Sequence, residues 1–204
     1  MNTKTNQIII GVFLLGALIF GACKKPEQQV SPPLPGNETM TGIGWRFQNV
    51  ANPNDTVWAF WQDLNVANPT IPPDTSHAVC ILKKNTTYSL SVHIYDSLPP
   101  LGTPSQVDLT YEIEVTRQNY HLYFFFPGGG LVKPTGGNHV TITATDHDSN
   151  NPPLPIGMHD TFTTDTATCN GWITGILRHQ PNAKNGTFAP GSTDSQVTFS
   201  VSIH

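Results

Sequence analysis

Within residues 85–97, NTTYSLSVHIYDS, apolar and polar side chains alternate without interruption from Tyr88 to Ile94. Successive side chains of a β-strand point to opposite faces of a sheet, so this period of two predicts a strand with one buried face. The buried face would carry Tyr88, Leu90, Val92 and Ile94, and the other face Ser89, Ser91, His93 and Tyr95. A chain with such a strand needs further strands to pair with it and a second layer to cover its apolar face.

Eight further segments carry strand signals and are separated by turn residues. They are 41–50, 56–64, 76–83, 120–130, 139–146, 159–165, 171–179 and 195–203. The connections are short and no long helical crossover appears between the strands, which argues against parallel βαβ units. The sequence therefore predicts a mostly β fold, an antiparallel Ig-like β-sandwich of about eight or nine strands with at most one short helix. A closed barrel is the alternative.

Residues 106–120 support two interpretations. Alternating apolar residues from Val107 to Val115 favour a strand, whereas Asp108 could cap a short helix with Glu112 and Glu114 in its first turns. The β-branched Val115 argues mildly against the helix. The sequence leaves both open.

The N-terminus resembles an export signal. Ile8 to Phe20 is apolar apart from glycine, which is too short to span a bilayer but fits the core of a secretory signal. The residues Phe20-Gly21-Ala22-Cys23 resemble a bacterial lipobox, in which the cysteine thiol is linked to diacylglycerol. We expect a lipoprotein signal peptide at 1–22, a Pro-rich flexible tether at 23–38 and one domain at 39–204, held at a membrane through the lipid on Cys23.

Composition narrows the class of partner. The formal net charge is −4, only 12% of residues are charged, and no basic stripe is present, which argues against nucleic acid as a partner. The sequence also contains no G-x-S-x-G, HExxH, CxxC or phosphate-binding glycine loop before a helix. A non-enzymatic protein is therefore the first expectation, and a hydrolase with an unrecognised site is an alternative.

Two cysteines remain once Cys23 is assigned to the anchor. Cys80 lies in the apolar run AVCIL and Cys169 beside a turn. Outside the cytoplasm the two thiols could form a disulfide. Alternatively, Cys80 is a small buried apolar residue.

The segment TDHDSNNPPLPIGMHD offers the best metal-ligand pattern. Asp146, Asp148 and Asn150 are spaced as at the start of a calcium-binding loop, but the glycine and glutamate of an EF-hand are missing. His147 and His159 flank the same loop, and imidazole suits Zn²⁺ or Cu²⁺. These five residues are the predicted metal ligands, for Ca²⁺ or for a transition metal. A turn stabilised by Asp and Asn side chains is the alternative.

The four tryptophans support a second kind of site. Flat rings stack on sugar faces, so Trp45, Trp58, Trp61 and Trp172 could bind a glycan. Packing in the core is the expected role for most of them. A tryptophan that stays exposed would favour the glycan interpretation.

Several motifs resemble a group of uncharacterised Bacteroidota lipoproteins, some labelled as having a type 1 periplasmic binding domain. They are the lipobox with its lysine pair, KKNTTYSLSVHIYD, EIEVTRQNYHLYFF, TDHDSNNPPLPIG and LRHQPNAKNGTFAPGSTDSQVTF. The resemblance implies an outer-membrane lipoprotein, on its periplasmic face or at the cell surface, and a short helix near 108–119. It carries no catalytic residue over to this chain, and the labelled fold would need βαβ units that the sequence lacks.

The leading functional expectation is a lipid-anchored cell-envelope lipoprotein that works as a non-catalytic binding or adhesion module. Its ligand could be a glycan, a small molecule or a protein. A metal-binding envelope protein is the first alternative, and the hydrolase is the second.

Overall fold

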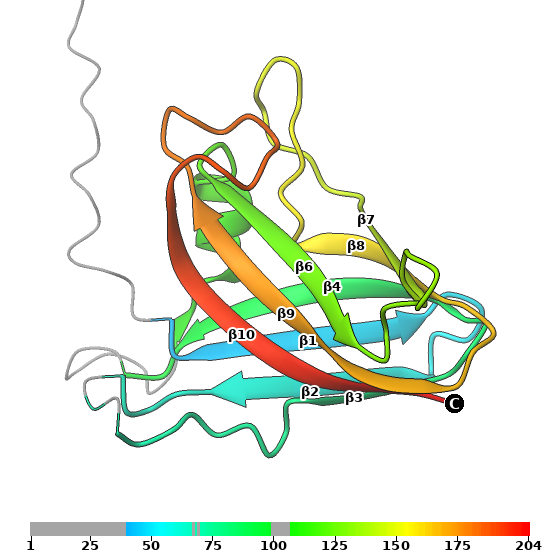
Figure 1. Cartoon of the computed structure of the whole chain (residues 1–204). Helices are drawn as coiled ribbons and strands as arrows, with labels where there is room; N and C mark the ends of the chain where they lie inside the picture. Colours follow the sequence, from blue (N-terminus) through cyan, green and yellow to red (C-terminus); the bar gives the residue numbers. More distant parts are fainter. Residues whose placement is uncertain (1–39, 67, 69, 99–106) are drawn as a thin grey trace, which may run out of the picture. The chain divides into compact units, whose positions relative to one another are not determined.

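The computed structural model describes residues 40–204 except 67, 69 and 99–106, and these residues form two packed β-sheets (Figure 1). One sheet has the strand order β2-β1-β4-β8-β7, with the short β5 paired to β4; the other has the order β3-β10-β9-β6. The first sheet contains β1 (Gly42–Asn49), β2 (Thr56–Gln62), β4 (Thr87–Asp96), β5 (Val107–Asp108), β7 (Val140–Ala144) and β8 (His159–Thr164). The second contains β3 (Val79–Leu82), β6 (His121–Gly129), β9 (Cys169–His179) and β10 (Ser192–Ile203).

The predicted mostly β sandwich is confirmed. Each of the nine segments predicted as strands overlaps a strand, and the alternative of a closed barrel is not formed by the described residues. One pairing departs from a purely antiparallel sandwich, since β3 runs parallel to β10 with Cys80 aligned to Val201. Within the described ranges, no helix is long and apolar enough to span a membrane.

Residues 106–120 combine the two interpretations that the sequence left open. The strand β5 is only two residues long, and the helix η1 (Glu112–Thr116) follows it. Asp108 does not cap this helix; its Oδ1 accepts the backbone N–H of Thr110 at 2.9 Å. The helix is of the π type, with the Arg117 N–H bonded to the Glu112 carbonyl at 2.8 Å. Its one buried residue, Ile113, joins the core.

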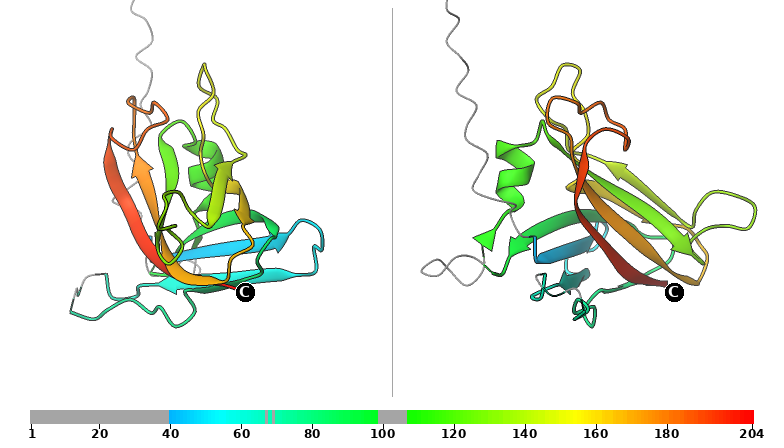
Figure 2. Two further views of the ribbon diagram at one scale, coloured as in Figure 1. Left: turned by 45° about the vertical axis from the view of Figure 1, so that its right-hand side comes forward. Right: turned by 60° about the vertical axis from the view of Figure 1, so that its left-hand side comes forward.

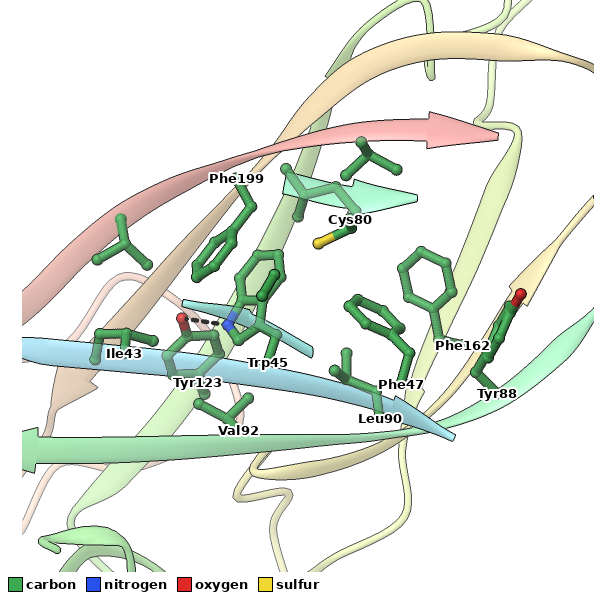
Figure 3. Close-up of a cluster of buried hydrophobic side chains, with 14 of the residues drawn as sticks. Ile43, Trp45, Phe47, Cys80, Tyr88, Leu90, Val92, Tyr123, Phe162 and Phe199 are labelled. Atoms are coloured by element: carbon green, nitrogen blue, oxygen red, sulfur yellow. Dashed lines mark hydrogen bonds between the residues drawn. The ribbon is translucent and has the colours of Figure 1, made fainter. Parts of the chain in front are cut away.

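Trp45 of β1 lies at the centre of the core (Figure 3). Its ring stacks on Phe199 of β10 at a centroid distance of 3.9 Å, and its indole N–H donates to the Tyr123 hydroxyl of β6 at 3.2 Å. Both partners belong to the opposite sheet, so one side chain joins the two layers by stacking and by a hydrogen bond. Gly175 of β9 makes room for this contact, because a Cβ there would lie 2.1 Å from the Tyr123 hydroxyl.

One carboxyl group lies in this apolar interior. Asp160 of β8 is 4% exposed, and its Oδ2 has no hydrogen-bond partner in the described part of the chain. Burial, helped by the nearby Asp146 charge, raises the pKa of Asp160 to about 8. The group is therefore largely a neutral acid at pH 7, which lowers the cost of keeping it inside.

The substitution Asp160→Asn tests this assignment. An aspartate in the unfolded chain loses its proton near pH 4, whereas the folded chain keeps it to about pH 8, so the wild-type free energy of unfolding falls as pH rises between these values. The amide does not titrate. Relative to wild type, the variant should gain up to about 1.4 kcal/mol of stability per pH unit between pH 5 and pH 8. Urea denaturation across this range measures the difference, and parallel pH profiles would contradict the assignment.

Candidate binding face and the predicted ligand residues

The structure describes most, but not all, of the residues singled out from the sequence. The expected lipidation site, Cys23, lies outside the described residues. Cys80 and Cys169 are both free thiols, which corrects the suggested disulfide. They align with Val201 and Ile203 of the intervening strand β10, so at least two strand spacings, about 9.6 Å, separate them. A disulfide needs Cα atoms within about 7 Å. Cys80 is instead a buried core residue, and burial raises the pKa of its thiol.

The loop between β7 and β8 uses its aspartates as hydrogen-bond acceptors. Asp146 accepts the backbone N–H groups of Gly157, Met158 and His159 at 2.8–3.0 Å. Asp148 accepts from Asn150 twice, from its backbone and its side-chain amide. The structure thus brings Asp148 and Asn150 together, in a loop that hydrogen bonds hold. The calcium site stays a prediction that this arrangement does not favour.

The second oxygen of Asp148 forms a buried ion pair. Lys184, on the loop between β9 and β10, places its Nζ 2.8 Å from Asp148 Oδ2, and the two side chains are 1% and 0% exposed. Burial opposes the charge on Asp148, but the Lys184 ammonium and the backbone N–H groups of Leu154 and Asn150 outweigh it and lower the pKa of the carboxyl. Figure 2 shows these two loops rising at the same end of the sandwich. The pair therefore ties them together.

Replacing Lys184 with methionine should show how much the Lys184–Asp148 ion pair contributes to the free energy of unfolding. The change leaves a buried carboxylate without its counter-ion, which costs about 3 kcal/mol of unfolding free energy. Lys133→Met is the matched control, because the Lys133–Asp165 pair at 3.0 Å is about one-third exposed and should contribute less than about 1 kcal/mol. Urea denaturation at neutral pH gives both values. Equal losses of stability in the two variants would show that burial does not determine how much each ion pair contributes.

The predicted histidine ligands do not gather around one point. His159 pairs with Glu114 of η1, and His147 lies in an isolated bridge with Pro155. In residues 40–204, apart from the undescribed positions, one group of His, Cys, Asp and Glu side chains is arranged to hold an ion: His121, His179 and Asp194. None of these three is among the five metal ligands predicted from the sequence.

The four tryptophans divide between core and surface. Trp45 is buried, and Trp61 packs against the core from β2. Trp58 and Trp172 are 46% and 49% exposed. Trp58 lies on the outer face of the first sheet, and Trp172 on the outer face of the second, where its ring covers Gly128. The core role holds for two of the four, and two remain available to a ligand.

The outer face of the first sheet is built on glycine. In β1, Ile43 and Trp45 point inward, so the residues between and before them, Gly42 and Gly44, form the outward surface. Because glycine has no side chain, the rings of neighbouring residues can extend across the strand at these two positions. A Cβ on Gly44 would lie 2.6 Å from the Trp58 ring, and one on Gly42 would lie 2.8 Å from the Phe60 ring. Both rings come from the adjacent strand β2 and share its outward face.

Two further rings reach the same glycines from the other side. His93 of β4 is aligned with Gly44, and Tyr95 with Gly42. The centroids of Trp58 and His93 lie 5.1 Å apart, those of His93 and Tyr95 6.5 Å, and those of Tyr95 and Phe60 5.9 Å. These four rings around the Gly42–Gly44 floor form a continuous strip, which we call the aromatic face.

The aromatic face is neutral and has polar groups beside it. Burial, chiefly, lowers the pKa of His93 and raises that of Tyr95, so both rings are uncharged near neutral pH. Ser91 Oγ hydrogen-bonds His93 Nε2 at 3.1 Å. Arg46 is aligned with Trp58, and Asp108 with Tyr95. Apolar rings flanked by hydrogen-bonding groups suit a ligand that presents both apolar and hydroxyl surfaces.

Sequence reasoning found parts of this face but not the whole. The alternation in 85–97 placed His93 and Tyr95 on the polar side of their strand, and Trp58 shares a face with Phe60 at a spacing of two. The missing step was the order of the strands, which sets β2 and β4 on either side of β1. The pattern Gly-Ile-Gly-Trp at residues 42–45 was the available signal, because glycine on the outward face of a strand often marks close approach of another group.

Comparison with known proteins adds no assignment. No protein-family model matches the chain, and no curated protein or solved structure shows significant similarity to it.

Proposed function

We propose that this chain is a non-catalytic, lipid-anchored envelope protein that binds carbohydrate on the aromatic face. The observation that carries the proposal is the strip of four neighbouring rings, Trp58, His93, Tyr95 and Phe60, on the outer face of the first sheet. Trp58 is 46% exposed although large aromatic side chains favour burial. An exposed apolar strip with polar groups beside it is typical of a binding surface.

The chemistry of the face selects the class of ligand. A pyranose ring has an apolar C–H face that packs on an aromatic ring and hydroxyls around its edge. Arg46 and Asp108, on strands that flank or pair with the ring-bearing strands, offer a donor and an acceptor for those hydroxyls. The four rings lie on β2 and β4, the two strands that flank β1, so the face extends across three strands and suits several linked sugar units better than one.

The proposed lipid anchor would determine where in the cell envelope the binding module is held. A diacylglyceryl group on Cys23 would hold the protein at the outer membrane, and the Pro-rich segment 23–38 would serve as the tether. A glycan-binding face displayed in this way would retain polysaccharide or attach the cell to it.

Trp58→Ala is the direct test of the face. Loss of one stacked ring should weaken binding of a soluble β-glucan or another oligosaccharide found by glycan-array screening by about tenfold or more, since an aromatic contact of this size contributes on the order of 1–3 kcal/mol. Trp172→Ala is the matched control, with 49% exposure on the opposite sheet. It should leave the dissociation constant unchanged. Calorimetric titration measures both, and loss of binding in the Trp172 variant alone would place the ligand on the other sheet.

Cys23→Ala tests the anchor separately. Without the thiol no lipid can be attached, so the variant should move from the membrane fraction to the soluble fraction after cell lysis. Metabolic labelling with a palmitate analogue gives an independent readout. A variant that stays in the membrane fraction would overturn the anchor while leaving carbohydrate binding to be judged by Trp58.

A further inference from the structure

A second group of side chains lies away from the aromatic face, where β6 begins and β9 ends. His121 and His179 are directly opposite each other in the pairing of these two strands, and their rings stack at 4.9 Å with an interplanar angle of 15°. Asp194 belongs to the neighbouring strand β10. His121 Nε2 lies 3.3 Å from Asp194 Oδ2, and His179 Nδ1 lies 3.8 Å from Asp194 Oδ1.

A β-bulge aims Asp194 at the histidines. The register of β10 against β9 shifts between Thr193 and Ser195, which leaves Asp194 as the extra residue. Thr193 is held on the outer side of the sheet, where its Oγ1 accepts from Arg178 Nη1 at 2.6 Å. Asp194, the extra residue, instead directs its carboxylate toward His121 and His179. Bulges commonly re-aim a side chain in this way.

The hydrogen bonding of His121 fixes which nitrogen faces Asp194. Its Nδ1 lies 3.2 Å from the Arg117 carbonyl oxygen, which can only accept, so Nδ1 carries the hydrogen. In a neutral imidazole Nε2 then holds a lone pair, directed at a carboxylate oxygen. A lone pair and a carboxylate oxygen that face each other 3.3 Å apart, where His121 is only 1% exposed, are two candidate ligand atoms for a metal ion.

We propose that His121, His179 and Asp194 bind one divalent transition-metal ion of the Zn²⁺ class. Two ligand atoms of a tetrahedral zinc ion lie about 3.4 Å apart, given metal–ligand bonds of about 2.1 Å, and the His121–Asp194 separation of 3.3 Å matches this. All three ligand atoms lie within 4.8 Å of one another, and the side chains of His179 and Asp194 are 34% and 23% exposed.

The arrangement has further properties of metal centres. A ligating histidine usually donates its other N–H to a carbonyl or carboxylate, as His121 does to Arg117, which fixes the ring and its tautomer. Two imidazoles and one carboxylate favour Zn²⁺ or Cu²⁺ over Ca²⁺ or Mg²⁺. Three protein ligands leave a fourth position for water or an added ligand. The ion would join the ends of β6, β9 and β10.

Titration of the metal-free, purified full chain with Zn²⁺ tests the site. Isothermal calorimetry should show one ion bound per chain. His179→Gln and Asp194→Asn should each weaken the affinity at least about tenfold, because each removes one of three ligands. His77→Gln is the control, because this exposed histidine lies outside the group and should leave the affinity unchanged. Ca²⁺ should produce no heat at the same concentrations.

The visible absorption of bound Co²⁺ reports directly on metal coordination, and it would not change if His179 and Asp194 had only a structural role. The wild-type chain should acquire the strong visible absorption of four-coordinate cobalt, and the His179 and Asp194 variants should lack it. Absence of Zn²⁺ binding would overturn the proposal. Undiminished binding in both variants, or loss in the His77 variant alone, would overturn it as well. Neither result bears on the aromatic face, where no residue of this group lies.

Discussion

The packing of Trp45 is the interaction on which the rest of the structure depends. This side chain comes from the first sheet, stacks on Phe199 of the second and donates its N–H to Tyr123, so it fixes the distance between the two layers. A buried indole needs a partner for its N–H, and a hydroxyl from the opposite sheet satisfies it without water. This contact requires glycine at position 175, because any side chain there would displace the rings of Trp45 and Tyr123.

The same strand that supplies the core also supplies the floor of the proposed binding face. Because a strand alternates its faces, Ile43 and Trp45 point into the core while Gly42 and Gly44 face outward. The glycines let Trp58 and Phe60 reach across β1 toward His93 and Tyr95. Core packing and surface architecture are thus coupled through four consecutive residues, and a shift of register in β1 would exchange the two faces.

Local pattern was enough to predict the fold class, because a period of two is visible within one segment and needs no knowledge of its partners. The alternation in 85–97 correctly assigned Tyr88 to the buried face, and the spacing of Trp58 and Phe60 is that of side chains on one face. The parallel pairing of β3 with β10 and the separation of Cys80 from Cys169 depend on strand order, which no local pattern contains. The group of His121, His179 and Asp194 depends also on a one-residue bulge, so spacing along the chain could not reveal it.

The central claim is that ligand binds on the outer face of the first sheet. Mapping amide and indole chemical-shift changes by NMR during titration with the oligosaccharide tests it most directly. The account predicts that the largest changes fall on Gly42, Gly44 and the Trp58 indole N–H, with the Trp172 indole unchanged. Changes centred on Trp172 and Gly128, with the Trp58 indole unmoved, would contradict it.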